Sequence, residues 1–212
     1  MTGPAEGYSV HIMNTKTDRE EKQVLELLDA VGKRSNVSQR HLANNLGIAL
    51  GLANSHLKRC IRKGFIKISE APANRYLYYL TPKGFAEKSR LTAKYLSCSF
   101  AFYRRAGESF VDVFRRCETR GWRRILLYGV SDLAEIAMLR AEESDVDIVG
   151  ILDPHTERRR FAGVSVWHSL RQVEPYDGFV LTELNSPLLS YEQLLKEVDK
   201  ERILIPDVLR LE

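Results

Sequence analysis

The chain of 212 residues is long enough for two domains that each bury a core of their own. Its 44% hydrophobic content and formal net charge of +4 are typical of a globular protein, and no apolar run has the length of a membrane-spanning helix. The three cysteines, Cys60, Cys98 and Cys117, lack metal-ligand spacing, and the N-terminus lacks the basic and apolar segments of a signal peptide. We therefore expect a cytoplasmic protein that holds no metal and enters no membrane.

The first domain is expected over residues 18–81, after a loose arm at 1–17. A helix from about Asp18 to Val31, with Asp18 as its N-cap, carries an apolar stripe. Residues 38–65 then read as two short helices around a tight turn at Gly47, with Gly64 ending the second helix. This pattern predicts a helix-turn-helix that packs on the first helix.

The outer face of the second short helix is polar or basic toward its C-terminal end and carries no carboxylate. Small and hydrogen-bonding residues near the start of such a helix can reach base edges, and Lys or Arg further along can hold phosphates. The competing interpretation is an ordinary helical hairpin with a solvated basic face. We expect double-stranded DNA to be contacted by Ser38, Gln39, Leu50, Gly51, Asn54, Ser55, Lys58, Arg59, Arg62 and Arg75.

Two β-rich segments, FIKISE and YLYYLT, follow with a turn at Pro72 and Asn74 and predict a hairpin wing with Arg75 at its tip. With the LTPKG segment after the second strand, residues 18–90 resemble MarR-type and related bacterial transcription regulators. The resemblance implies a dimer that binds palindromic operators. The sequence departs from that pattern at Ala49, Leu50, Gly51 and Leu52, where polar or β-branched residues are usual, and apolar contact with thymine methyl groups could substitute.

Residues 82–121 predict one long helix, with Thr81 as its N-cap, Pro82 at its first position and Gly121 after its end. Aromatic and aliphatic residues recur along it, from Phe85 to Phe114. We expect this stripe to pack against its symmetry mate and the first helix and so to form a homodimer; the alternative is a stripe packed wholly within its own subunit.

Residues 122–212 alternate apolar strands with helices, which indicates an α/β Rossmann-like domain with a five-stranded parallel sheet. Ligands of such sheets bind beyond the carboxyl ends of the strands. The residues expected there are Gly129, Ser131, Asp132, Asp153, His155, Arg158, Thr182 and Asn185.

The first loop of this domain, GVSDLA, keeps only the first glycine of the G-x-G-x-x-G fingerprint, which argues against an ordinary dinucleotide site. The order of domains is similar to that of the Rex-type redox-sensing repressors. The segments LLYGVSDLAEIA, DIVGILD and GVSVWHSL resemble the N-terminal domain of bacterial sugar acyltransferases and polysaccharide-biosynthesis enzymes. This second resemblance implies a nucleotide or nucleotide-sugar as ligand, with Gly129, Ser131, Asp132 and Asp153 at the matching positions.

These features together predict a dimeric, sequence-specific DNA-binding regulator with a small-molecule effector and no catalytic residues. His155 and His168 lack a nucleophile or metal partner at fixed spacing. One alternative is a nucleotide-dependent or nucleotide-sugar-dependent enzyme with an accessory winged helix. Another is a non-catalytic scaffold for protein interactions.

Overall fold

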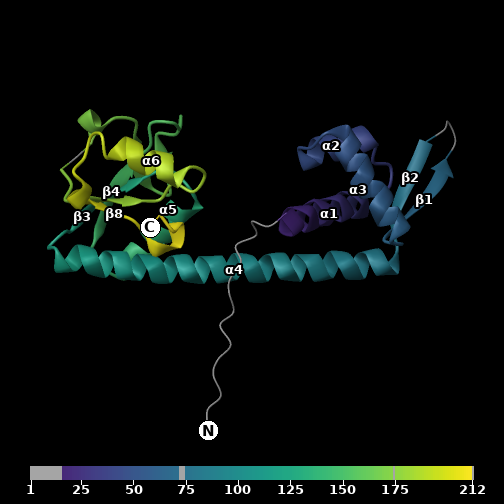
Figure 1. The fold of residues 1–212 in the computed structure, drawn as a ribbon, viewed down its shortest axis with the longest axis horizontal. Helices are drawn as coiled ribbons and strands as arrows, with labels where there is room; N and C mark the ends of the chain where they lie inside the picture. The colour runs from purple at the N-terminus through teal and green to yellow at the C-terminus, as the bar shows by residue number, and fades with distance from the viewer. Residues whose placement is uncertain (1–15, 72–74, 174, 212) are drawn as a thin grey trace, which may run out of the picture. The chain divides into compact units, whose positions relative to one another are not determined.

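The computed structural model describes residues 16–71, 75–173 and 175–211 (Figure 1). The chain divides into two compact units, residues 1–101 and 102–212. Helix α4 (Pro82–Thr119) contributes its first half to one unit and its second half to the other. No helix within the described ranges is long and apolar enough to cross a membrane.

The N-terminal unit begins with α1 (Lys16–Lys33), α2 (Gln39–Leu46) and α3 (Leu50–Arg62). An antiparallel hairpin follows, with β1 (Ile66–Ala71) and β2 (Arg75–Leu80) paired in register from Ile66 opposite Leu80. The turn predicted at Pro72 and Asn74 lies outside the described residues. The apolar faces of these elements meet in one core, formed by Val24, Leu27, Leu28, Val31, Val37, Leu42, Leu57, Cys60, Phe65, Ile66, Tyr78 and Leu91.

Most of the predicted helix ends in this unit are confirmed. The Ser38 hydroxyl accepts the backbone N–H of His41 and caps α2, and Gly47 turns the chain with φ 59°. Gly64 adopts φ 73° after α3, where a side chain would be strained. The prediction for Asp18 was wrong, because α1 starts at Lys16 and Asp18 lies buried in its first turn.

The LTPKG segment fixes how α4 starts. Thr81 donates its hydroxyl hydrogen to the Gly64 carbonyl at 2.6 Å and accepts the N–H of Gly84 at 3.0 Å, so it caps the helix. A Cβ at Gly84 would lie 2.0 Å from the Phe65 carbonyl oxygen, so only glycine allows this approach. The helix then runs unbroken for 38 residues, about 57 Å at 1.5 Å per residue.

The apolar stripe of α4 divides into two parts. Phe110, Val113 and Phe114 are fully buried in the core of the C-terminal unit, and Leu91 is buried in the N-terminal unit. Leu91 therefore shares a core with α1, as expected, whereas Phe110, Val113 and Phe114 pack within their own subunit, which was the alternative interpretation. Large side chains in the middle and at the start of the helix stay exposed: Phe85, Tyr95, Leu96, Phe100 and Tyr103.

A six-stranded sheet forms the C-terminal unit, with the spatial order β5-β6-β4-β3-β7-β8. Its strands are β3 (Arg124–Tyr128), β4 (Asp147–Leu152), β5 (Arg160–Phe161), β6 (Val164–Trp167), β7 (Gly178–Leu181) and β8 (Ile203–Leu204). The sheet is mixed, whereas the sequence predicted five parallel strands: β5 is an additional strand, antiparallel to β6, and the other neighbouring pairs are parallel.

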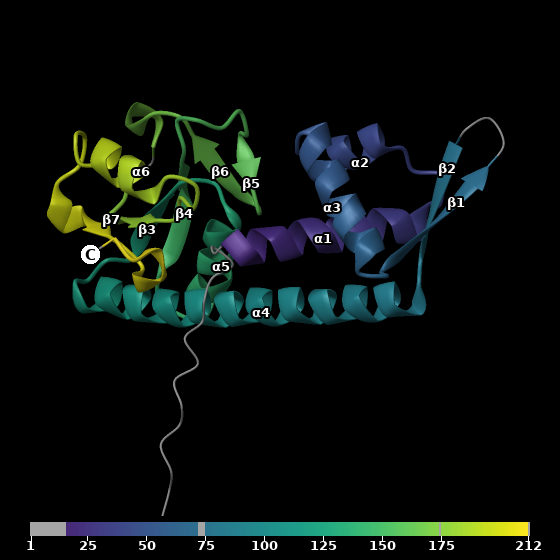
Figure 2. The same ribbon diagram turned by 45° about the vertical axis from the view of Figure 1, so that its right-hand side comes forward.

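Helices cover both faces of this sheet (Figure 2). On β3, Ile125 and Leu127 face the core that contains α4 and α5 (Asp132–Ala141). Leu126 and Tyr128 face the core that contains α6 (Pro187–Leu194). Short 3-10 helices complete the unit: η1 (Leu170–Gln172), η2 (Lys200–Arg202) and η3 (Asp207–Leu209).

Candidate nucleic-acid interface and strand-end cavity

Helix α3 presents a continuous exposed face without carboxylates. Leu50 and Leu52 are 44% and 46% exposed at its start, and Gly51 and Ser55 are exposed with them. Lys58 and Arg62 are exposed further along. Ala53, Leu57 and Cys60 turn inward and anchor the opposite face in the core. The arrangement places small and apolar groups at the N-terminal end of the helix and cations at its C-terminal end.

Two other residues predicted to contact DNA have competing structural roles. The Arg59 guanidinium pairs with the Glu20 carboxylate at 3.0 Å, so it ties α3 to α1. Asn54 is half-buried, and its Oδ1 is buried without a hydrogen-bond partner in the described part of the chain. Neither residue is as accessible to a phosphate as Lys58 or Arg62.

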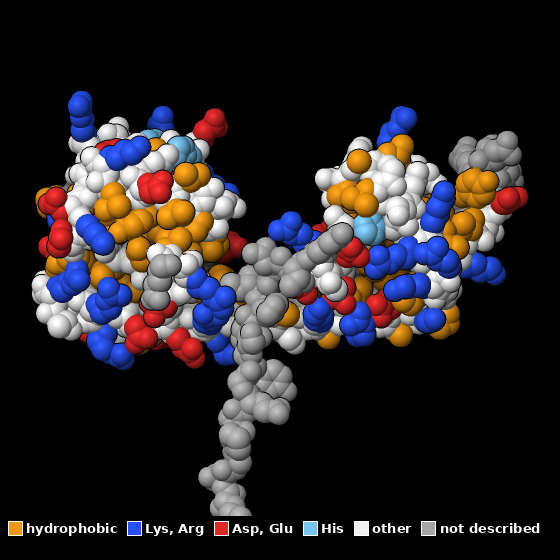
Figure 3. Space-filling view, in the orientation of Figure 1, with side chains coloured by type: hydrophobic (Ala, Val, Ile, Leu, Met, Phe, Trp, Pro, Cys, Tyr) orange, Lys and Arg blue, Asp and Glu red, His pale blue; other side chains and the backbone are white. Residues whose placement is uncertain are grey.

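The remaining predicted contacts lie at the start of α2 and on the wing. Ser38 and Gln39 are exposed, and the Gln39 amide donates to the Tyr78 hydroxyl at 3.4 Å, across the groove between α2 and β2. Arg75 begins β2, and its side chain lies outside the described residues. Figure 3 shows Lys and Arg side chains gathered around the C-terminal end of α3, a local positive field that suits a polyanion.

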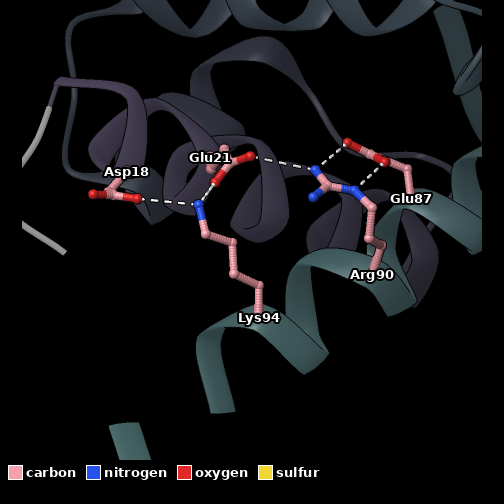
Figure 4. Close-up of polar contacts among 5 residues, drawn as sticks. All are labelled: Asp18, Glu21, Glu87, Arg90 and Lys94. Atoms are coloured by element: carbon pink, nitrogen blue, oxygen red, sulfur yellow. Dashed lines mark hydrogen bonds and ion pairs between the residues drawn. The ribbon is translucent and has the colours of Figure 1, made fainter. Parts of the chain in front are cut away.

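An ionic network joins α1 to α4 inside the N-terminal unit (Figure 4). Lys94 pairs with Asp18 and Glu21, and Arg90 pairs with Glu21 and with Glu87. The hydrogen bond from Lys94 lowers the pKa of Glu21, and that from Arg90 lowers the pKa of Glu87. The sequence alone did not reveal this network, because the two helices are far apart along the chain.

A cavity of about 440 Å³ opens at the carboxyl ends of β3 and β4, in the C-terminal unit. The structure brings together six of the predicted ligand residues in its wall: Ser131, Asp132, Asp153, His155, Arg158 and Asn185. Gly129 and Thr182 are buried beside it, and the Thr182 hydroxyl bonds to the Gly129 carbonyl at 2.6 Å. Thr156 and Phe161 also line the cavity, but no sequence pattern singled them out.

The polar groups nearest the β3–α5 loop are already paired within the protein. Asp153 accepts the N–H of Val130 through one carboxylate oxygen and the N–H of His155 through the other. Ser131 caps α5 by accepting the N–H groups of Leu133 and Ala134, and it donates to the Thr182 carbonyl. These bonds fix the loop, and they occupy donors and acceptors that a ligand would otherwise use.

This pairing does not fit a dinucleotide. A diphosphate in a glycine-rich loop is held by free backbone N–H groups at a helix N-terminus, and here those of Val130, Leu133 and Ala134 are used. The exposed Asp132 carboxylate and Glu183 add negative charge to the cavity wall. Hydroxyl groups, which donate to carboxylates, match this wall better than phosphates do.

The cysteines behave as packing residues where they are buried. Burial raises the pKa of Cys60 to about 11 and that of Cys117 to about 12, so both stay protonated at neutral pH. Cys60 lies in the core of the N-terminal unit. The described residues contain no group of three or more His, Cys, Asp or Glu placed to hold a metal ion.

Residues 21–67 match the family described as winged helix-turn-helix DNA-binding. The match covers most of α1, all of α2 and α3, and the start of β1, the elements that position the exposed face of α3. The N-terminal unit is therefore a winged helix-turn-helix domain of the DNA-binding class. A search of curated proteins found no significant match to the chain.

Several solved structures, among them transcription regulators, are similar to parts of this chain. They include MepR of Staphylococcus aureus (16% identity, TM-score 0.34, 39% of this chain and 60% of that one). FabT of Streptococcus pneumoniae in complex with DNA has 21% identity and a TM-score of 0.33, over 43% of this chain and 65% of that one. PcaV of Streptomyces coelicolor has 20% identity and a TM-score of 0.37, over 47% of this chain and 77% of that one. The chain also spans 61% of a MarR family protein of Mycobacterium tuberculosis, so it covers less than two thirds of several of these proteins.

Proposed function

We propose that the protein is a sequence-specific transcription regulator that places α3 in the major groove of DNA. The observation that carries the proposal is the exposed, carboxylate-free face of α3 within a winged helix-turn-helix domain. Lys58 and Arg62 hold phosphates, and the small and apolar residues Leu50, Gly51 and Leu52 face the base edges. Thymine methyl groups are the base features that such residues contact, so the operator contains A·T pairs at these positions.

The test is a selection of genomic fragments by the purified full chain, followed by anisotropy titration of the best fragment. Lys58→Ala should weaken binding about 3-fold to 10-fold near 0.1 M salt, because one phosphate contact is lost. Lys196→Ala, the same change at an exposed residue of the C-terminal unit, is the matched control and should bind as the wild type does. If no fragment is retained at low salt, or if the two variants weaken binding equally, the proposal is wrong.

We also propose that the regulator is a homodimer assembled through the exposed stripe of α4. Phe85, Leu96, Phe100 and Tyr103 fall within an arc of about 60° at 100° per residue, so a single partner surface can cover them. A dimer would present two α3 helices to a palindromic site.

Sedimentation velocity tests the dimer. The double variant Leu96→Glu, Phe100→Glu should sediment as a monomer, since two carboxylates would be buried in the interface. Leu139→Glu changes a comparably exposed leucine on α5 and should leave the dimer intact. A wild-type chain that sediments as a monomer at micromolar concentration would contradict the proposal.

The C-terminal unit, on this proposal, binds a small-molecule effector in the strand-end cavity. The proposal is supported by the position of the cavity at the carboxyl end of β3, where the chain continues to β4 on one side of β3 and later to β7 on the other; open α/β sheets commonly bind ligands at such a switch in strand order. The carboxylates of the wall favour the hydroxyl-bearing part of a ligand, as in a sugar, and a link to polysaccharide synthesis rests on the sequence resemblance. An effector changes DNA affinity only if it binds the DNA-competent and incompetent states unequally.

A further inference from the structure

The C-terminal unit contains a second cavity, of about 460 Å³, away from the carboxyl ends of β3 and β4. It lies at the β8 edge of the sheet, between the last turns of α4 and helix α6. Apolar side chains of Ile203, Ile205 and Leu211 line part of the cavity. In Figure 3 the face that carries α6 and β8 shows an apolar area with Lys and Arg side chains at its margin.

Cations dominate the wall of this cavity. Arg116, Arg120, Lys200 and Arg210 line it, against the carboxylates of Glu201 and Asp207. The strand-end cavity has the reverse balance, since Asp132, Asp153 and Glu183 line it and Arg158 is the cation among its described residues. Two cavities of similar volume in one unit thus have opposite signs of charge.

One of these cations, Arg120, is held in place by the fold. Arg120 donates from Nη1 to the Glu201 carbonyl at 2.7 Å, and its guanidinium carbon lies 4.9 Å from the centroid of the Trp122 ring. Arg116 is one helical turn earlier. Arg120, which directly follows α4, donates its backbone N–H to the Arg116 carbonyl at 3.3 Å, so the two arginines lie on the same side of this turn. A fixed guanidinium loses little conformational entropy when it binds an anion.

Arg210 occupies a strained backbone position. Its φ and ψ are 50° and 48°, the left-handed region that favours glycine, at the end of η3. A charged residue at a backbone position that favours glycine is the kind of outlier that motivates a functional hypothesis for its side chain. Its place in the wall of the basic cavity supplies that use.

We propose that this basic cavity binds a small molecule that bears a diphosphate or phosphate group. Arg116, Lys200 and Arg210 bind the phosphate oxygens, and the rest of the ligand lies against Ile205 and Leu211. The concave shape and volume are those of small-molecule sites, whereas a DNA contact surface would be open and extended. This phosphate site does not depend on DNA binding by α3.

Isothermal titration of the full chain with inorganic pyrophosphate, and in parallel with ADP, tests this site. Arg116→Gln removes one cation, and Arg210→Gly removes another while keeping a residue that favours the observed backbone conformation. Each should weaken binding by about tenfold or more, because a charge-assisted bond is lost. Arg115→Gln, a neighbouring exposed arginine paired with Asp112, is the control and should bind as the wild type does. Arg158→Gln tests the competing location, because Arg158 is the cation of the strand-end cavity.

Several outcomes would overturn the proposal. One is the absence of saturable pyrophosphate and ADP binding by the wild-type chain. A second is equal weakening by Arg115→Gln, which would indicate unspecific attraction, and a third is loss only in Arg158→Gln, which would place the phosphate at the strand ends. If Arg116→Gln and Arg210→Gly retain pyrophosphate binding but weaken DNA retention, the surface is a nucleic-acid contact instead.

Discussion

Gly129 directly follows β3 and adopts a conformation that strongly favours glycine. Its φ is 98°, and a Cβ there would lie 2.9 Å from the Glu183 backbone nitrogen and Cα. We expect Gly129→Ala to lower the free energy of unfolding by roughly 2–4 kcal/mol, the sum of backbone strain and steric displacement. Urea denaturation of the full chain measures this change.

Gly163→Ala is the matched control for that substitution. Gly163 has a similar φ of 94°, but a Cβ there would meet open space. It should cost only the backbone strain, about 1 kcal/mol. Equal losses in the two variants would show that the approach of Glu183 contributes nothing.

His56 makes the stability of the N-terminal unit depend on pH. Its side chain is buried in α3, and burial lowers its pKa below the ordinary value of 6.5. The folded chain therefore keeps His56 neutral where the unfolded chain takes up a proton, so the stability present above pH 7 is lost as the pH falls below about 6.5.

The measurement is the unfolding midpoint of the full chain between pH 7.5 and pH 5.5, a window above the titration of the carboxylates. His56→Gln should remove most of the pH dependence, and His41→Gln, at an exposed histidine of α2, should keep it. An unchanged pH dependence in His56→Gln would contradict this assignment.

The ionic contact between α1 and α4 depends on Glu21, whose carboxylate accepts hydrogen bonds from Lys94 and Arg90. Since the pKa of Glu21 is lowered from 4.5, its contribution is present above about pH 4.5 and is lost as the pH falls through the folded-state pKa. We expect Glu21→Gln to destabilise the chain by about 1 kcal/mol at pH 7 and by much less at pH 3.5.

Glu26→Gln is the control for Glu21→Gln, because the ion pair of Glu26 lies within α1. Glu26 pairs with Lys22 at 4.0 Å on the exposed face of α1, so its loss should change stability by only about 0.3 kcal/mol. Chemical denaturation at both pH values separates the variants. A Glu21→Gln effect that persists at pH 3.5 would mean that packing, and not charge, holds the two helices together.

Elements with a local signal could be predicted from the sequence. Ser38, Gly47 and Thr81 define helix ends through their own chemistry, and the apolar runs of β3, β4 and β7 define buried strands. Strand β5 could not be predicted, because its two residues carry no periodicity and become a strand only by pairing with β6.

Contacts between residues far apart in the chain could not be predicted from the sequence either. The Arg59–Glu20 pair joins residues 39 positions apart, and nothing in the sequence of α3 indicates that Arg59 pairs with α1. Apolar residues recur along α4 at the same spacing where the helix packs on the sheet and where its side chains stay exposed. Periodicity alone could therefore not predict which part of the stripe is buried. The strand-end residues could be predicted as neighbours, because parallel strands end at one edge of a sheet.

At the scale of the whole molecule, the winged helix-turn-helix unit and the C-terminal α/β unit share one continuous helix, α4. In the regulator we propose, α3 of the N-terminal unit contacts DNA, and the C-terminal unit binds the effector. Its central claim is that cations on the exposed face of α3 hold DNA phosphates.

The salt dependence of DNA binding tests that claim most directly. The logarithm of the association constant should fall linearly with the logarithm of the salt concentration, with a slope of about 0.9 per phosphate contact. The double variant Lys58→Ala, Arg62→Ala should make that slope shallower by about 2 units, and Lys196→Ala should leave it unchanged. A slope that stays the same in the double variant would show that the DNA phosphates are held elsewhere on the molecule.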